Sequence, residues 1–578
     1  MMSANGKYGS DCSKRAKSRI YPIVLLVFLI GAIAGNRAAY GYPSNNVPLD
    51  NWAYEGLDKL AGFGLIHSDV KGMRPYTRLE VARLVNEALR TEKEKKLKLP
   101  SLLCYFLDKF KRQYKDELAY YGYGKVASPP TLTIKPLEEA KLDYVYSDGR
   151  PQDYLNLLHR SALNQYPYGG GGIVGYEGTP LLPNNQGVVY GKGSNLSFDF
   201  ASSFQLWGLF SGYVEPIFLV RQNGSPGMFS GSTPAIFGNY SSNDIDLLTG
   251  YLKFSPSDAF EIEVGRDSMW WGQGYAGSLL LTDNAPPLDM IKVSNPVSII
   301  LPWYFSYLGP FRYNLFCARL EADRDYPHTL YGGMHIDFKP TPNLEIGGGR
   351  TYQFGGQGSG SPGTFLEWLK DTSFYSIGGT TNNPDNFEAE LDWRYRMPCL
   401  WDSEFYGEWG GEDTGFKLNV RKLLFQDIGY LLGLYFPRIT PDARTDLRLE
   451  YEDNVNEPGS KLTGLWYTHT TYFSGMTYQG LILGDPMGPD ARRGYVRVTR
   501  YVQNNLKVGL DGSYTQRGAN LGRCVSGEFV LGADVTYDIN AALTGMVRYS
   551  WGDFRNFNLV PGDNQQDNLL MMQMKYDF

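Results

Sequence analysis

The sequence predicts a mainly β fold, in which a transmembrane antiparallel β-barrel follows a small α-helical domain. The 578 residues include 43 Tyr and 67 Gly, a composition typical of many short strands rather than long helices. From about residue 131 onward, apolar residues alternate with polar and charged ones. The last eight residues, MMQMKYDF, form one amphipathic strand that ends on an aromatic side chain.

The first 41 residues are typical of an export signal. A basic stretch at positions 14–19 precedes the apolar run YPIVLLVFLIGAIAG, which is too short to span a bilayer comfortably. Small residues at 39–41 offer a cleavage site. We therefore expect residues 1–41 to be a signal peptide, with an uncleaved N-terminal anchor as the alternative.

Residues 42–92 carry two helix signals. Asp50 is a plausible N-cap for a first helix, and Thr77 with Glu80 forms a capping box before a second. The segments WAY at 52–54, GLI at 64–66 and RPYTRLE at 74–80 resemble one S-layer homology module. That resemblance implies contact with peptidoglycan or its attached polymers, and a periplasmic cap without a ligand is the alternative. Residues 93–130 are charged and broken at Pro100, which indicates a helical linker.

The strand-rich region, residues 131–578, is interpreted as an outer-membrane barrel of a Gram-negative bacterium. In EAELDWRYRM, the apolar residues 389–397 alternate with charged ones such as Glu388 and Glu390, which we expect to face a wet lumen. A soluble sandwich would also alternate, but it would be far shorter. The region is long enough for roughly 16–20 strands. The terminal strand resembles the signal read by the barrel-assembly machinery, and we expect it to pair with the first strand.

Two stretches resemble the Wzi-type capsule-assembly family of outer-membrane proteins. One is VGRDSMWWGQGYAGSLLLTDNAPPLDMIKVSNP (Val264–Pro296), and the other is HTTYFSGMTYQGLILGDPMGPDARR (His469–Arg493). The family usually has His where this chain has Asp485. The resemblance implies a barrel of about eighteen strands with a plugged lumen. It also implies a lectin-like, non-enzymatic protein that holds capsular polysaccharide on the cell.

Residues of both stretches suit a glycan, because sugars stack on aromatic rings and hydrogen-bond to planar polar groups, and arginine suits an acidic polymer. The glycan-binding candidates are Trp270, Trp271, Gln273, Asp283, Asn284, Asp485, Asp490, Arg492 and Arg493. The alternative is structural: Gly272, Gly274 and Gly277 beside the two tryptophans would fold a plug or a tight turn.

Signals for other classes are weak. The five histidines are scattered without metal-ligand spacing, so we predict no metal, no cofactor and no enzyme activity. A surface hydrolase built on His469, Ser474 and Asp485 is the distant rival. The net charge of −6 gives no nucleic-acid signature. The four cysteines beyond the signal match no zinc pattern, and one disulfide stays open.

The sequence therefore predicts an outer-membrane barrel that binds and anchors, or helps to assemble, capsular or extracellular polysaccharide at the cell surface. The alternative is an S-layer-homology-containing porin for small solutes, in which the lumen charges select the solute. Expected partners are surface polysaccharide, outer-membrane lipid, the barrel-assembly machinery and, through a periplasmic N-terminal module, peptidoglycan.

Overall fold

A computed structural model describes most of the chain. The described residues are 42–123, 131–154, 173–223, 242–360, 386–412, 428–455, 466–469, 471–519 and 524–578. The predicted signal peptide, residues 1–41, lies outside them. No helix among the described residues has the length and apolar character needed to cross a membrane.

Eighteen antiparallel strands close into one barrel, which confirms the predicted fold class. In spatial order around the barrel they are β2 (Leu132–Ser147), β3 (Gly193–Leu206), β4 (Phe210–Arg221), β5 (Asn243–Ser257), β6 (Phe260–Asp267), β8 (Leu288–Ser294), β10 (Pro310–Arg319), β11 (Leu330–Thr341), β12 (Leu344–Phe354), β13 (Asn386–Met397), β14 (Ser403–Glu412), β15 (Ile428–Phe436), β16 (Thr445–Asp453), β19 (Ala491–Gln503), β20 (Leu506–Arg517), β21 (Ser526–Asp538), β22 (Leu543–Arg555) and β23 (Gln565–Asp577). The two-residue β9 (Ile299–Ile300) adds to the edge of β10.

The last strand closes the barrel against the first, as predicted. In the β2–β23 pair, Leu142 lies opposite Met574 and Tyr144 opposite Met572. Closure gives every backbone group at this seam a partner, so no strand edge is left to the bilayer or to another chain.

The faces of the strands follow the membrane pattern. On β13, Leu391 is 52% exposed on the outside, whereas Asp392 is 1% exposed and faces the interior. At the end of the chain, Met574 and Phe578 are likewise exposed. An apolar exterior around a charged interior is the reverse of a soluble sandwich and is typical of a barrel in lipid.

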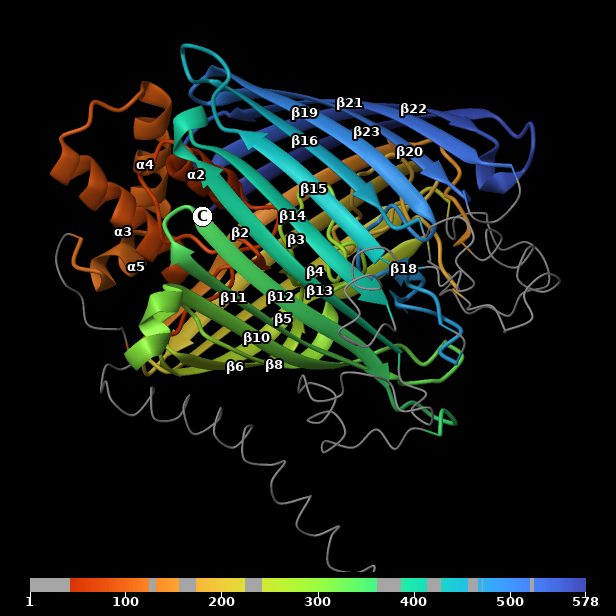
Figure 1. Ribbon diagram of the computed structural model, residues 1–578, viewed down its shortest axis with the longest axis horizontal. Coiled ribbons are helices and arrows are strands. Elements are labelled where there is room, and N and C mark those ends of the chain that lie inside the picture. The colour runs from red at the N-terminus through yellow and green to blue at the C-terminus, as the bar shows by residue number, and fades with distance from the viewer. Residues whose placement is uncertain are drawn as a thin grey trace, which may run out of the picture.

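The two ends of the barrel differ. At one end, here named the helical end, the connections between strands are short, as at Asn504–Asn505 between β19 and β20. Trp207 and Trp401 are exposed in two of these turns, and Trp303 is exposed in the longer β8–β10 connection at the same end, as in an interfacial aromatic belt. At the other end, named the loop end, the connections are long. Figure 1 shows helices α2–α5 gathered at the helical end, beside the C-terminus of the chain.

The N-terminal helices share one core. They are α2 (Trp52–Ala61), α3 (Arg78–Lys95), α4 (Ser101–Gln113) and α5 (Lys115–Tyr120). Apolar side chains from all four pack into one cluster with Tyr501 of β19. The Thr77 cap is confirmed, since its Oγ1 accepts from the Glu80 amide at 3.0 Å. The first cap was predicted one residue early: Asn51, not Asp50, accepts from Ala53.

The α3 capping box is only half formed. Glu80 does not reach back to Thr77 but accepts from Ser298 in the β8–β10 connection, with Ser298 Oγ at 2.7 Å. The S-layer homology of residues 42–92 and the division at residue 92 remain predictions. Among the described residues, Cys104, Cys317, Cys399 and Cys524 form no disulfide.

Candidate functional site: the plugged lumen

Two connections from the loop end fold into the barrel and carry the two sequence stretches noted above. The first plug loop, residues 268–287, joins β6 to β8 and contains β7 (Trp270–Trp271). The second plug loop, residues 466–490, leads into β19 and contains the hairpin of β17 (Thr477–Tyr478) and β18 (Leu481–Ile482). β7 pairs with β1 (Met73–Arg74). The first plug loop thus also contacts the N-terminal segment, here residues 42–77, which precede α3.

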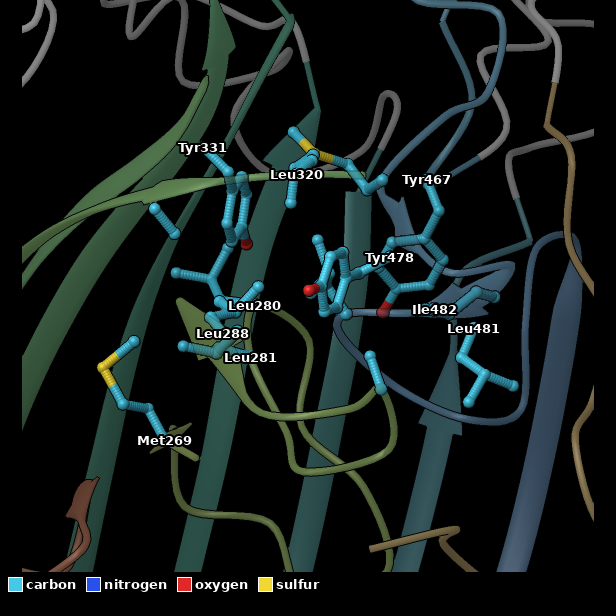
Figure 2. Packing of buried hydrophobic residues seen from close by; sticks show 14 of the residues in the cluster. Met269, Leu280, Leu281, Leu288, Leu320, Tyr331, Tyr467, Tyr478, Leu481 and Ile482 are labelled. Atoms are coloured by element: carbon cyan, nitrogen blue, oxygen red, sulfur yellow. The ribbon is translucent and has the colours of Figure 1, made fainter. Parts of the chain in front are cut away.

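An apolar core packs between the plug loops and the barrel wall, as Figure 2 shows. Trp271 is fully buried there, with its ring 5.2 Å from that of Phe316 on β10. Leu280 from the first plug loop and Ile482 from the second belong to the same cluster. Burial of this many large side chains indicates that the two loops form a packed plug rather than a loose constriction.

Two wall glutamates fasten the backbone of the first plug loop. Glu408 on β14 accepts from the amides of Gly274 at 2.7 Å and Leu279 at 2.8 Å. Glu450 on β16 accepts from the amides of Tyr275 at 2.8 Å and Ala276 at 2.9 Å. Each of the two side chains therefore holds two nearby backbone amides of the first plug loop in place, and a buried amide without an acceptor would be costly.

A third wall glutamate joins the plug to the N-terminal segment. Glu345 on β12 accepts from the amides of Lys71 and Gly72, both at 2.8 Å, and from Gln273 Nε2 at 3.0 Å. Gln273 in turn accepts at Oε1 from Arg394 Nε at 2.7 Å. The amide side chain of Gln273 therefore ties the plug to β12 and β13 at once.

The glycines of the WGQG segment are needed for close approach. Gly272 has φ +110°, which favours glycine. A Cβ on Gly274 would lie 1.9 Å from the carbonyl oxygen of Gly277. A Cβ on Gly277 would lie 2.3 Å from Asp485 Oδ2 in the second plug loop. These contacts support the structural interpretation of the glycines.

The second plug loop is fixed by charge and by amide contacts. Asp485 Oδ1 accepts from the Met487 amide at 2.8 Å and from Arg493 Nη2 at 3.0 Å. Arg493 Nε donates to Glu452 on β16 at 2.8 Å. Asn284 Nδ2 donates to the carbonyl of Ile482 at 3.0 Å, which joins the two plug loops.

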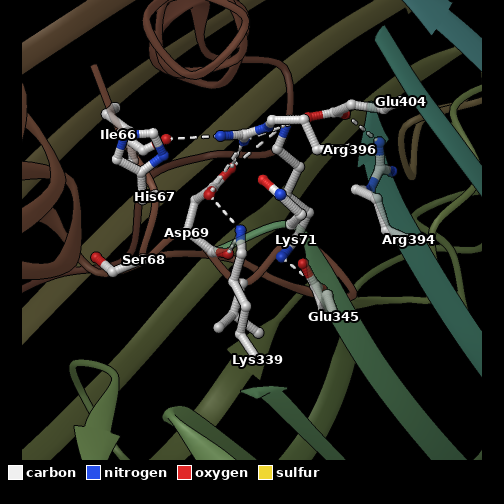
Figure 3. A network of polar contacts seen from close by, with 12 residues as sticks. Ile66, His67, Ser68, Asp69, Lys71, Lys339, Glu345, Arg394, Arg396 and Glu404 are labelled. Atoms are coloured by element: carbon white, nitrogen blue, oxygen red, sulfur yellow. Dashed lines mark hydrogen bonds and ion pairs between the residues drawn. The ribbon is translucent and has the colours of Figure 1, made fainter. Parts of the chain in front are cut away.

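A buried ion network holds the N-terminal segment to strands β11, β13 and β14 of the wall, as Figure 3 shows. Asp69 lies 2.5 Å from Lys339 on β11 and 3.3 Å from Arg396 on β13. Lys71 lies 3.0 Å from Glu404 on β14. Burial opposes ionisation of Asp69, but Lys339 and Arg396 outweigh it and hold its pKa well below the usual range.

A cavity of about 590 Å³ remains between the N-terminal segment, the first plug loop and the strands β2–β5 and β19–β23. Trp270, Tyr275 and Asp283 of the first plug loop reach it, as does the Arg497 side chain of β19. Burial raises the pKa of Asp283 to about 7, and the charge of Asp50 adds to the shift. The polar and aromatic side chains that line this space suit a small polar ligand.

The structure distributes the nine candidate residues over three environments. Trp270 and Asp283 line the cavity. Arg492 points to the outside of β19, 3.6 Å from Asp453 and with its side chain 40% exposed. The remaining six are buried in the plug or its attachment: Trp271, Gln273, Asn284, Asp485, Asp490 and Arg493. They do not form one sugar-binding face, and glycan contact by any of the nine stays a prediction.

The three wall glutamates are functional residues that sequence reasoning missed. Period two places Glu345, Glu408 and Glu450 on the inner face, but many other acidic residues share that signal. The spacing of the histidines in the sequence did not reveal a further cluster. His335 lies beside Asp337 and Asp392, and these three form the one group of potential metal ligands found among the described residues.

Comparison with known proteins gives a family to this plugged barrel. The model of the capsule assembly protein Wzi family matches residues 164–569, which include both plug loops. The chain belongs to the Wzi capsule-assembly family. The sequence-based family prediction is thus confirmed for the barrel, while the N-terminal helices lie outside the matched part.

Individual relatives are distant. An uncharacterized 55.8 kDa protein in the cps region of Klebsiella pneumoniae is 26% identical over 259 residues, which are 44% of this chain and 47% of that protein. The match thus spans about half the length of the curated relative.

Two solved barrels are similar in structure. One, titled as Wzi, an outer-membrane protein involved in group 1 capsule assembly in Escherichia coli and a carbohydrate-binding β-barrel, superposes with a TM-score of 0.64 at 18% identity. That alignment covers 93% of this chain and all of the other, so the two share a fold. OccD3 of Pseudomonas aeruginosa is less similar, with a TM-score of 0.41 at 11% identity over 77% of this chain and 91% of that one.

Proposed function

We propose that this protein is an outer-membrane β-barrel that binds and anchors, or helps to assemble, capsular or extracellular polysaccharide at the cell surface. Membership of the Wzi family supports the proposal. The observation that carries it is the plug: an apolar core lies inside the barrel, and Glu408 and Glu450 hold the first plug loop to the wall. A long polymer would then meet the loop end of the barrel instead of passing through it.

The barrel is proposed to stand with its helical end in the periplasm. Outer-membrane barrels have short periplasmic turns and longer outer loops, and this chain has short turns at the helical end. Helices α2–α5 would then be a periplasmic cap that seals the lumen from below. Contact of this cap with peptidoglycan and insertion by the barrel-assembly machinery belong to the proposal as well.

The porin alternative is less favoured by the same geometry. A porin needs a continuous water-filled path, and selectivity charges must line it. Here the charged wall residues Glu345, Glu408 and Glu450 are engaged by backbone amides of the plug and the N-terminal segment.

The hydrolase rival also lacks support. His469 Nδ1 accepts from two backbone amides, and Ser474 Oγ donates to Asp325 at 2.6 Å. Asp485 is engaged by Arg493. Because each side chain has another partner, the trio offers no activated hydroxyl, and a non-enzymatic role is proposed.

Two measurements on purified, folded protein test the proposal. The first is binding to polysaccharide extracted from the same cells, with heat-unfolded protein as the control. We expect saturable binding by the folded protein only, and equal binding by both forms, or by neither, would contradict the proposal. The second is conductance in planar bilayers, where we expect no sustained open channel; a large steady conductance would favour the porin.

A further inference from the structure

Two glycines on β12 leave room for a cluster of buried side chains on the barrel wall. Gly347 lies between Asp337 of β11 and Asp392 of β13 in the strand register, and Gly349 lies between His335 and Glu390. A Cβ on Gly347 would lie 2.0 Å from Asp337 Oδ1 and 2.4 Å from Asp392 Oδ2. The four flanking side chains therefore meet over the middle strand, because that strand has no side chains there.

The cluster is buried and has few hydrogen-bond donors, of which one is Gln273 Nε2, bonded to Asp392 Oδ1. His335 and Asp337 are fully buried, and Glu390 and Asp392 are at most 2% exposed. Within the described part of the chain, His335 contacts Asp337, Glu390 and Asp392 as ion pairs of 3.2–3.7 Å, and the oxygens of Asp337 and Glu390 accept no hydrogen bond from any other group. Buried charges in proteins are normally paired, hydrogen-bonded or bound to a metal ion.

The cations around the cluster are engaged elsewhere. Lys339, on the same strand as His335, is bonded to Asp69 at 2.5 Å. Arg394, two residues beyond Asp392, is bonded to Gln273 and to Glu404. A protonated imidazole would offer one positive charge against three carboxylates, so the cluster stays short of positive charge.

The remaining distances suit a single ion. His335 Nε2 lies 3.2 Å from Asp392 Oδ2 and 3.7 Å from Glu390 Oε1, and His335 Nδ1 lies 3.2 Å from Asp337 Oδ2. One ligand atom from each of His335, Asp337 and Asp392 can be chosen so that all three lie within 4.8 Å of one another. An ion bound at about 2.0–2.2 Å to each ligand sets the ligand atoms at most about 4.4 Å apart, so small side-chain shifts bring one imidazole nitrogen and the carboxylates onto a single ion.

We propose that His335, Asp337, Glu390 and Asp392 bind a divalent transition-metal ion in the barrel wall. An imidazole nitrogen together with carboxylate oxygens suits Zn²⁺ or Mn²⁺ rather than Ca²⁺, which prefers oxygen ligands alone. Asp392 Oδ1 accepts from Gln273 Nε2 at 2.6 Å, so a plug residue orients a ligand, as outer-shell partners of metal sites do. The ion would join β11 and β13 directly behind the plug.

The ligands come together when β11, β12 and β13 pair, and they are buried in the folded barrel, so the ion is supplied during folding. The test therefore uses the full chain refolded into detergent with Zn²⁺, with Mn²⁺ or with neither, then passed over a chelating resin. Metal is measured by inductively coupled plasma mass spectrometry, and folding by the heat-modifiable mobility of the barrel. We expect about one ion per chain and a thermal midpoint that rises with the metal.

Matched variants locate the ion. His335→Gln and Asp392→Asn should each lose the metal and its thermal shift. Asp511→Asn should keep both, because Asp511 is a lumen carboxylate already paired with Arg497 and Arg548 at 2.8 Å. Folded wild-type protein with less than about a tenth of an ion per chain after refolding with either metal would overturn the proposal. About one ion per chain in a folded variant that carries both His335→Gln and Asp392→Asn would overturn it too. The test needs no polysaccharide and is independent of the proposed function.

Discussion

Replacing Glu408 with Ala removes the wall carboxylate that holds the first plug loop. The amides of Gly274 and Leu279, bonded to it at 2.7 and 2.8 Å, lose their acceptor. Ser278 Oγ, which donates to the same carboxylate at 3.1 Å, loses that hydrogen bond. Each buried amide left without a partner costs about 1–3 kcal/mol, so the closed plug is weakened by about 2–6 kcal/mol. Since about 1.4 kcal/mol is a tenfold change, the open fraction should rise at least about 30-fold.

The assay is the frequency of open events of single barrels in planar bilayers. Glu408→Gln keeps one acceptor oxygen and should give an intermediate frequency. Asp511→Ala is the matched control, since Asp511 accepts from Arg497 and Arg548 and from no plug amide. If folded Glu408→Ala opens as rarely as the wild type, or if Asp511→Ala opens equally often, the fastening role of Glu408 is refuted.

Three further predictions concern other parts of the plug and the N-terminal helices. Trp271→Ala should lower stability by about 3–5 kcal/mol, measured as the loss of heat-modifiable mobility with temperature, because a fully buried indole is removed; an unchanged midpoint would contradict this. Gly277→Ala should displace Asp485 by steric overlap and make the second plug loop cleavable by protease in a barrel that is still folded; protection equal to the wild type would count against it. Burial opposes ionisation of Glu80, but Arg83 at 2.8 Å outweighs it and lowers its pKa from 4.5 to about 2. Ionised Glu80 therefore stabilises the folded protein by about 3 kcal/mol above pH 4.5, and this stabilisation is lost as the pH falls toward 2. In wild-type protein the helices should become easier to digest with protease between pH 6 and pH 3, and Glu80→Gln should make this change smaller. An unchanged pH profile in the variant would show that another group causes the pH dependence.

Local patterns in the sequence predicted the barrel well. The alternation at Met572 and Met574 placed the final strand, and its closure against β2 follows because an open edge is costly in lipid. The Thr77 cap was predictable because it depends on four consecutive residues, 77–80. Strand identity, closure and caps are short-range properties, or they follow from a general constraint.

The plug was not predictable in the same way. Trp270 and Trp271 are neighbours in sequence, yet Trp270 reaches the cavity while Trp271 packs in the core. Glu408 meets an amide 134 residues away, and no local pattern distinguishes it from the other inner-face carboxylates. His335 gains its acidic neighbours only through the register of three strands, which alternation alone does not fix.

Retention of surface polysaccharide by whole cells is the direct test of whether this barrel anchors the polymer. Cell-bound and shed polymer are compared in a strain that lacks this gene and in the same strain complemented with the full chain. We expect the deletion strain still to make the polymer but to release it into the medium, and we expect complementation to restore attachment. Unchanged retention together with reduced uptake of small solutes would contradict the account and favour a porin.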